Sequence, residues 1–184
     1  YYQLGAGFMV ILMETLRSGL GTDFGLSDME GIKESGQYLL AMNGYSNTFN
    51  FGDGNAALMD GALLHWYANR FNMPELSLYQ RSMQSTSVMY DEYLSMLWYS
   101  PGLVEGKSLD QRQPDHFLLS DEYESIASFR GFGGDATQIY TAIKSGMNNN
   151  SHTDLDIGDF VIEALGERWI TEMGSDNYNL PGYS

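Results

Sequence analysis

The chain has 184 residues and contains no cysteine, so disulfide bonds and thiolate metal sites are excluded. Basic side chains are scarce: nine Lys and Arg stand against 24 Asp and Glu, which gives a formal net charge of -15. Proteins bind phosphate backbones through clustered Lys and Arg, and the absence of such a cluster argues against a nucleic-acid binder. No run of about eighteen apolar residues occurs, so a membrane span is not supported.

The sequence does contain enough apolar side chain to form a core. Hydrophobic residues make up 43% of the chain and aromatic residues 14%, and the length suits one or two domains. The chain begins at Tyr1 without an initiator methionine or a signal peptide and stops at Ser184 without a terminal signature. We therefore expect a fragment of a longer protein.

The first hundred or so residues have the periodicity of amphipathic helices. Phe8, Leu12 and Leu16 recur every fourth residue, and such a stripe is expected to face a core. Three further helices are expected: one from a Ser27 cap to Asn43–Gly44, one from an Asn55 cap through Met59 to Phe71, and one from Val88 to a stop at Pro101–Gly102.

Residues 106–114 are polar and turn-prone, which is typical of a linker. They divide a helical part, residues 1–105, from a part at 115–184 in which short aromatic and branched segments favour strands. Three strands are expected near residues 116–119, 123–129 and 138–143. The sequence therefore predicts an α+β chain.

A β-hairpin is predicted near the C-terminal end. Gly166–Glu167 suits a two-residue turn between strands at 159–165 and 168–173. This turn would place Phe160, Ile162 and Ala164 opposite Met173, Thr171 and Trp169 on an apolar face, which we expect to be core. Val161 and Glu163 would then lie on the other face.

One histidine stands beside a set of carboxylates in the polar segment before this hairpin. The segment reads Ser151-His152-x-Asp154-x-Asp156-x-Gly158-x-Phe160, and it is followed by Gly166-x-Arg168-Trp169 and Gly174-Ser175-Asp176-Asn177-Tyr178. Together with Tyr1-Tyr2-Gln3 near one end, Gly21-Thr22-Asp23-Phe24 and Phe49-Asn50-Phe51-Gly52-Asp53, it resembles the signature of the heparinase II/III-like polysaccharide lyases.

This resemblance implies the last helices of an α/α toroid followed by the start of an antiparallel β-sandwich. It also implies a periplasmic or secreted lyase that cleaves uronic-acid glycans, heparan-type or alginate-like, by β-elimination. In that reaction a base removes the proton at C5 and an acid protonates the glycosidic oxygen that leaves C4, without a required cofactor. Histidine and tyrosine suit these proton transfers.

The resemblance also assigns candidate residues by position. His152 matches the histidine of the sandwich, and Tyr1 or Tyr2 matches the catalytic tyrosine of the toroid. Counting back from Gly7–Phe8 favours Tyr1, whereas the Tyr-Tyr-Gln pattern favours Tyr2, so both stay open. Arg130 is a candidate to pair with a substrate carboxylate, and Tyr178 to stack on a sugar ring.

Some relatives hold a structural zinc through a second histidine, two positions after the first, and an aspartate at the end of the hairpin. Asp154 and Glu172 stand at these positions, and a pair of carboxylates suits calcium better than zinc. The family's upstream asparagine, which binds the uronate carboxylate, is not among these residues. The fragment is therefore expected to be inactive alone, with the rest of the parent chain packed against it.

Structural interpretations compete with the functional ones. A histidine in a polar loop is usually a surface or capping residue, and Asp156 and Asp159 are typical of turns. Arg168 is expected to form a structural ion pair with a local acid such as Glu172. The alternative to a lyase is a non-catalytic carbohydrate-binding or structural module of the same fold.

Overall fold

The structure is a computed structural model that describes residues 2–54, 61–82, 89–109, 116–120, 123–131, 138–149, 152, 154–175, 177 and 179–181. The chain forms two compact units. The helical unit comprises residues 1–40 and 59–113, and the sheet unit comprises residues 41–58 and 114–184. Helices and an antiparallel sheet in one chain confirm the α+β class. Segment 41–58, which the division at 105 gives to the helical part, belongs to the sheet unit.

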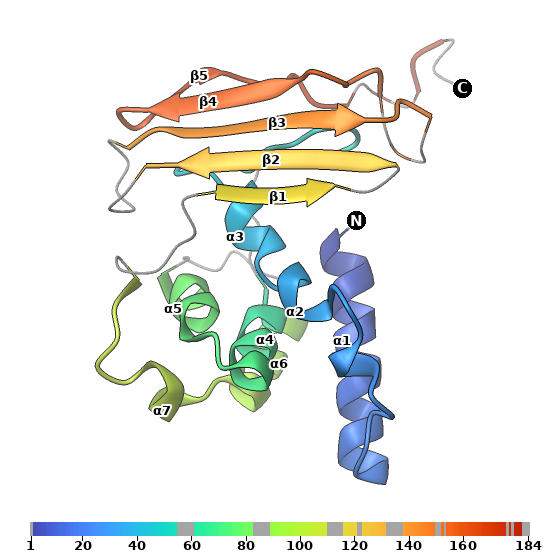
Figure 1. The fold of residues 1–184 in the computed structure, drawn as a ribbon, viewed down its shortest axis with the longest axis vertical. Coiled ribbons are helices and arrows are strands. Elements are labelled where there is room, and N and C mark those ends of the chain that lie inside the picture. The colour runs from blue at the N-terminus through green and yellow to red at the C-terminus, as the bar shows by residue number, and fades with distance from the viewer. Residues whose placement is uncertain are drawn as a thin grey trace. The chain divides into compact units, whose positions relative to one another are not determined.

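The helices follow one another along the first part of the chain (Figure 1). They are α1 (Tyr2–Leu20), the 3-10 turn η1 (Leu26–Asp28), α2 (Ile32–Ser35), α3 (Tyr38–Met42), α4 (Leu63–Phe71), α5 (Pro74–Ser82), α6 (Met89–Trp98) and α7 (Pro101–Val104). None of the helices in the described ranges is both long and apolar enough to cross a membrane. Asn55, Met59 and Val88, which the predicted helices include, lie outside the described residues.

Helix α1 is confirmed, but the predicted buried stripe is wrong. The side chains that α1 buries are Ala6, Val10 and Met13, whereas Phe8 is 65% exposed and Leu12 is 53% exposed. Apolar residues occur around most of this helix, so their spacing does not decide which stripe meets the core. The core of the helical unit is built from residues of several helices, among them Val10, Leu39, Leu64, Tyr67 and Leu76.

The single helix predicted from Ser27 to Asn43 is broken in the structure. Helix α2 ends at Ser35 and α3 begins at Tyr38. The backbone at Gly36 lies so close to Tyr67 that a Cβ there would be 2.7 Å from the ring, so this approach requires glycine. Ser27 is not a cap, because its hydroxyl bonds Asp23 and accepts a hydrogen bond from Arg70.

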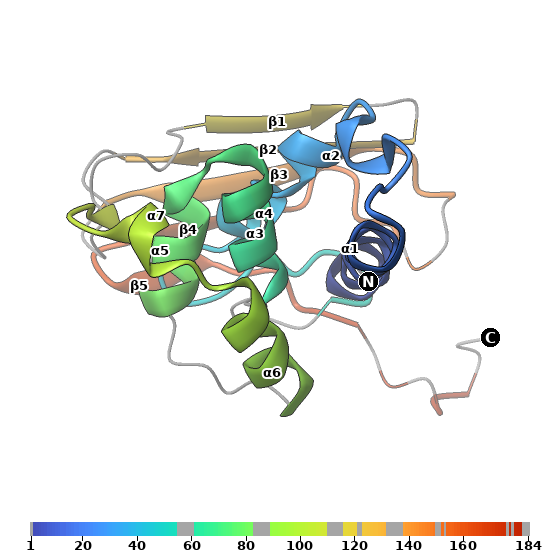
Figure 2. The same ribbon diagram turned by 90° about the horizontal axis from the view of Figure 1, so that it is seen from below.

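The described residues of the sheet unit form five antiparallel strands, β1 to β5, in the order of the sequence (Figure 2). The predicted strands are confirmed, with shifted ends. The bounds are β1 (His116–Ser120), β2 (Glu124–Arg130), β3 (Tyr140–Gly146), β4 (Phe160–Ala164) and β5 (Glu167–Ile170).

The hairpin of β4 and β5 exists, but its predicted turn and register are wrong. The turn residues are Leu165 and Gly166, with φ of 57° and 81°, which are the two positive values of a type I′ turn. Ala164 therefore pairs with Glu167 and Glu163 with Arg168. A bulge beside Ile162 and Glu163 follows, and Ile162 pairs with Ile170.

The buried face of the hairpin is the one that we expected to be exposed. Val161 is fully buried and Glu163 is 2% exposed, whereas Phe160 is 42% exposed and Trp169 is 66% exposed. The change moves the partner of Glu163 by two residues, from Ile170 to Arg168, and so leaves the same β4 side chains on each face. What differs from the prediction is which of the two faces is buried. The inner face of the sheet thus carries Glu163 and Arg168, and the outer face carries exposed apolar side chains.

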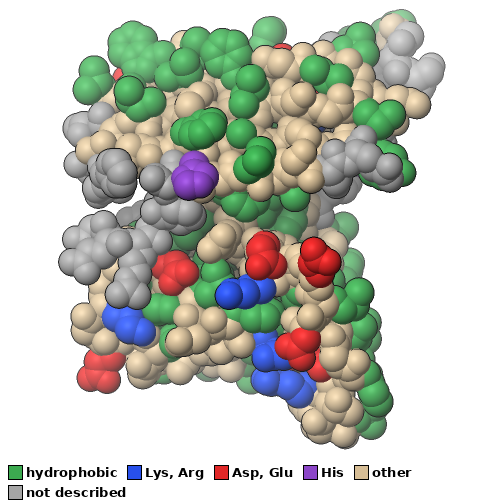
Figure 3. All heavy atoms as spheres, in the orientation of Figure 1, with side chains coloured by type: hydrophobic (Ala, Val, Ile, Leu, Met, Phe, Trp, Pro, Cys, Tyr) green, Lys and Arg blue, Asp and Glu red, His purple; other side chains and the backbone are tan. Residues whose placement is uncertain are grey.

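The outer face of the sheet is apolar over several strands. In the upper part of Figure 3, apolar side chains gather over the strands of the sheet unit. The pairing places Leu118 opposite Ala127, Ala127 opposite Ile143, and Ile143 opposite Phe160. Of these, Leu118, Ile143 and Phe160 are exposed.

Candidate functional site

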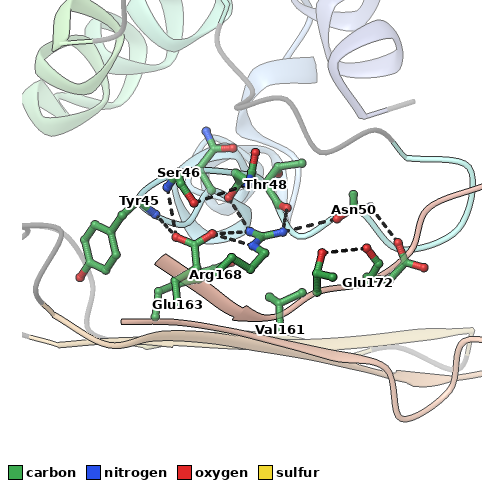
Figure 4. A network of polar contacts seen from close by, with 12 residues as sticks. Tyr45, Ser46, Thr48, Asn50, Val161, Glu163, Arg168 and Glu172 are labelled. Atoms are coloured by element: carbon green, nitrogen blue, oxygen red, sulfur yellow. Dashed lines mark hydrogen bonds and ion pairs between the residues drawn. The ribbon is translucent and has the colours of Figure 1, made fainter. Parts of the chain in front are cut away.

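A short polar loop, residues 43–50, lies against the inner face of the sheet (Figure 4). A β-bridge pairs Asn43 with Thr48, and the N–H of Gly44 donates to the carbonyl of Asn47 at 2.8 Å. The hydroxyl of Tyr140 on β3 donates to the carbonyls of Ala41 and Met42, at 2.9 and 3.0 Å. The sheet therefore holds the backbone just before the loop.

A buried ion pair holds the loop itself. Arg168 Nη2 and Glu163 Oε1 are 2.5 Å apart, and their side chains are 6% and 2% exposed. Glu163 Oε2 accepts the N–H groups of Tyr45 and Ser46, at 2.6 and 3.1 Å. Arg168 donates to the carbonyls of Asn47 and Thr48, each at 2.8 Å, as the dashed lines in Figure 4 show.

We call this arrangement, Glu163 and Arg168 with the backbone of residues 45–48, the ion-pair clasp. Charge-assisted hydrogen bonds of this kind satisfy backbone groups that a loop cannot pair by itself. A Cβ at Gly44 would lie 2.5 Å from the Glu163 carboxylate, so the clasp also requires glycine there. The partner of Arg168 is thus Glu163 and not Glu172, which corrects the acid named for the predicted ion pair.

A second buried ion pair holds the loop between β3 and β4. Lys144 Nζ lies 2.7 Å from Asp156 Oδ1, with side chains 1% and 2% exposed. The backbone of Lys144 pairs with Gly158 and Asp159, at 2.9 and 3.0 Å. Lys144 Nζ also lies 5.6 Å from the ring centroid of Phe51. Asp156 is therefore half of a buried ion pair, and not a residue that shapes a turn through its side chain.

His152 and Asp53, 99 positions apart in the sequence, meet where these two loops lie together. Nδ1 of His152 and Oδ2 of Asp53 lie 2.7 Å apart, which is a hydrogen-bond distance. The N–H of Asp53 donates to the carbonyl of His152 at 3.3 Å. The His152 side chain is 48% exposed and that of Asp53 is 10% exposed. An imidazole that solvent can reach is thus held by a nearly buried carboxylate.

The backbone of His152 has a φ of 63°. Positive φ is uncommon outside glycine, and when it occurs histidine, asparagine and aspartate are enriched. Such a conformation persists only where the surrounding contacts impose it, and it is frequent at functional sites. The contacts of Asp53 with both the ring and the carbonyl of His152 supply that constraint.

Of the two candidate tyrosines, Tyr1 lies outside the described residues. Tyr2 belongs to the helical unit, where its hydroxyl donates to the carbonyl of Ser35. Burial, reinforced by the neighbouring Tyr67, raises the pKa of Tyr2 well above its usual value. Its phenol therefore stays protonated and has a structural partner, while its catalytic assignment stays a prediction.

Of the two candidates for substrate binding, Arg130 is among the described residues and Tyr178 is not. Arg130 Nη2 donates to the carbonyl of Asn43 at 2.6 Å, and its guanidinium lies 5.2 Å from the ring centroid of Tyr140. These contacts give Arg130 a structural function beside the loop at 43–50. Tyr178 lies outside the described residues, so its stacking on sugar stays a prediction.

The predicted metal pair is Asp154 and Glu172. Glu172 Oε2 accepts hydrogen bonds from Asn50 Nδ2 and the N–H of Gly174, both at 2.7 Å. Burial raises the pKa of Glu172, and the charges of Asp159 and Asp154 add to this. Two carboxylates without imidazole, one of them already bonded by two N–H groups, do not fit a zinc site. In the described part of the chain no three His, Asp or Glu side chains form a metal-binding group.

No protein-family model matches the chain, and no curated protein sequence matches it. His152 was predicted from the sequence, but its partner Asp53 and the buried charges Lys144 and Glu163 were not. Asp53 stands in the segment Phe49–Asp53 that carries part of the family resemblance, and this was the available signal. Lys144 and Glu163 sit in strands that otherwise read as apolar, and a lone charge in such a strand indicates a buried ion pair.

Proposed function

We propose that this chain is the part of a polysaccharide lyase that joins the last helices of an α/α toroid to the start of a β-sandwich. The apolar outer face of the five-stranded sheet supports the sandwich, because the two sheets of a β-sandwich pack face to face through apolar side chains. The resemblance in motifs around His152, described above, supports the family.

The observation that carries the proposed activity is the geometry of His152. A half-exposed imidazole, oriented by Asp53 through Nδ1, is suited to accept a proton through its other nitrogen. In the proposed reaction His152 accepts the C5 proton of the uronate, and the electron pair forms the C4–C5 double bond. The C4–O bond breaks, and a tyrosine hydroxyl protonates the leaving oxygen.

We assign the tyrosine to position 1. Tyr2 already donates its hydroxyl proton to Ser35 inside the helical unit, and removal of that hydrogen bond would disturb the core. Alignment from Gly7–Phe8 also favours Tyr1. Burial raises the pKa of Tyr2, so its phenol holds its proton more tightly and is less suited to protonate a leaving group.

The charge of the chain favours a weakly sulfated substrate. A strongly acidic protein repels a densely sulfated polyanion, and the net charge is -15. Alginate, hyaluronate and unsulfated heparan carry their charge mainly on the uronate carboxylate, so fewer cations are needed. We propose a uronan of this class, in a periplasmic or extracellular setting.

The test is the ultraviolet absorbance of the unsaturated uronate product, measured with alginate, hyaluronate and heparan. It uses the longest chain that carries this sequence, because the family's carboxylate-binding asparagine is not among these 184 residues. His152→Ala is compared with His116→Ala, a second exposed histidine of the sheet unit that the proposal does not use.

We expect absorbance to rise with one substrate, and His152→Ala but not His116→Ala to abolish the rise. If none of the three uronans is cleaved although binding is measurable, the lyase proposal is wrong. The non-catalytic carbohydrate-binding module would then be the better account, in which the contact of His152 with Asp53 only joins two loops.

A further inference from the structure

We infer that Asp53 is a positioning residue for His152, which fixes the imidazole in the tautomer with its proton on Nδ1. The inference rests on the proposed function for its catalytic consequence, but the contact itself is independent of it. With the proton on Nδ1, the neutral ring presents Nε2 as a proton acceptor. Asp53 thereby makes His152 the base of the elimination, and not its acid.

The first argument is that Asp53 makes two contacts to one residue. Its Oδ2 lies 2.7 Å from Nδ1, and because an ionised carboxylate can only accept, this contact favours a proton on Nδ1. Its own N–H donates to the His152 carbonyl at 3.3 Å. Two contacts fix the ring relative to its own backbone, whereas one would leave rotation about the hydrogen bond. The small exposure of Asp53, at 10%, keeps water from competing strongly for the carboxylate.

The second argument is that each of the two segments is anchored by its own buried ion pair. The ion-pair clasp of Glu163 and Arg168 holds the backbone of residues 45–48, five residues before Asp53. Lys144 and Asp156 hold the loop that carries His152. Anchors on both segments hold the Asp53 carboxylate and the His152 ring at a fixed distance and orientation. Catalytic groups require such support because small displacements lower the reaction rate strongly.

The third argument is that Phe51 links the two anchored segments. It lies two residues before Asp53, and its ring centroid is 5.6 Å from Lys144 Nζ, a cation–π distance. Asn50, one residue earlier, donates to Glu172 at 2.7 Å. Asn50 and Phe51 therefore bind the segment before Asp53 to two other residues of the sheet unit, Glu172 and Lys144. These contacts restrict the position of Asp53.

The direct test is nitrogen NMR of the His152 imidazole in the intact chain, at a pH where an ordinary imidazole is neutral. The protonated ring nitrogen resonates well apart from the unprotonated one, so the tautomer is read without an activity assay. We expect the proton on Nδ1 in the native protein. In Asp53→Asn the amide can donate to Nδ1, and we expect the Nδ1–H population to fall.

The kinetic test compares Asp53→Asn, Asp53→Glu and Glu167→Gln on the uronan that the native chain cleaves. We expect Asp53→Asn to lower kcat on the order of 100-fold with little change in KM, because ring orientation and not substrate binding is lost. Asp53→Glu keeps the acceptor and should recover part of the rate. Glu167→Gln, an exposed carboxylate at the hairpin turn, is the matched control and should retain native kcat.

The outcomes separate this inference from the proposed function. A native tautomer with the proton on Nε2 would overturn the positioning inference. So would an Asp53→Asn enzyme that keeps its tautomer and kcat while His152→Ala is inactive, and the lyase proposal would then survive alone. If no uronan is cleaved, the lyase proposal fails and the NMR measurement alone decides whether Asp53 holds the ring. If Asp53→Asn fails to fold, the inference is decided by the NMR tautomer of the native protein and by the kcat of Asp53→Glu.

Discussion

The helical unit and the sheet unit differ in the interactions that stabilise each of them internally. The helical unit packs apolar side chains such as Val10, Leu64 and Leu76 into one cluster. The inner face of the sheet unit instead buries two ion pairs, Glu163 with Arg168 and Lys144 with Asp156. Helices satisfy their own backbone groups, so apolar packing suffices between them, whereas loops against a sheet need partners for exposed N–H and C=O groups.

The difference predicts how each unit fails. A buried ion pair contributes little net stability compared with apolar packing, but removal of one partner leaves the other charge buried and unpaired. An apolar core loses stability in proportion to the atoms removed. The sheet unit should therefore respond sharply to single charge changes, and the helical unit to changes of volume.

The largest effect is expected for Arg168→Ala. It leaves the Glu163 carboxylate without its cation and the carbonyls of Asn47 and Thr48 without their donor. We expect a loss of about 3–5 kcal/mol in the free energy of unfolding of the sheet unit, measured by urea titration. Hydrogen exchange should localise the change to β4, β5 and residues 43–50. Unchanged exchange in that region would show that the clasp does not hold the loop.

A comparable or smaller effect is expected for Leu64→Ala in the core of the helical unit. Leu64 is fully buried, and truncation removes transfer energy and leaves a cavity, at a cost of about 2–5 kcal/mol. The control is Leu12→Ala, whose side chain is 53% exposed on α1 and should cost well under 1 kcal/mol. Equal losses in urea titration would mean that Leu12 is also part of a buried interface.

The smallest effect is a pH dependence of the helical unit. His65 is buried with Nδ1 2.6 Å from Ser77 Oγ, and burial, with the charge of Arg81, lowers the pKa of His65 to about 4. Since the unfolded chain binds this proton near pH 6.5, stability is complete above that pH. It is lost as pH falls from about 6.5 through about 4.

His65→Gln keeps a polar group beside Ser77 but cannot titrate in this range. The difference in thermal melting temperature between the native chain and His65→Gln, measured at several pH values, isolates the histidine from the many carboxylates that titrate near pH 4. We expect the native chain to lose stability relative to the variant below pH 6.5. Parallel curves would show that His65 protonates equally in the folded and unfolded states.

Much of the secondary structure could be predicted from local patterns. The strands at 116–120 and 124–130 follow from runs of aromatic and branched residues, and the long helix α1 follows from its apolar periodicity. The side that each element buries could not be predicted from these patterns, as the exposed Phe8 on α1 and Phe160 on β4 show. Both α1 and β4 carry apolar residues on two faces, so the pattern of apolar residues does not decide which face is buried.

The sequence by itself determined the α+β class, the absence of disulfides, the acidic charge and the choice of His152 as the residue to examine. Only the tertiary structure decided that Leu165–Gly166 is the turn, which pairs Glu163 with Arg168 and not with Ile170, and that the face carrying this pair is the buried one. It also decided that Asp53 meets His152. Asp53 and His152 are 99 positions apart in the sequence, and their contact depends on how the two loops are anchored. Local residue preferences do not determine contacts between residues so far apart in the sequence.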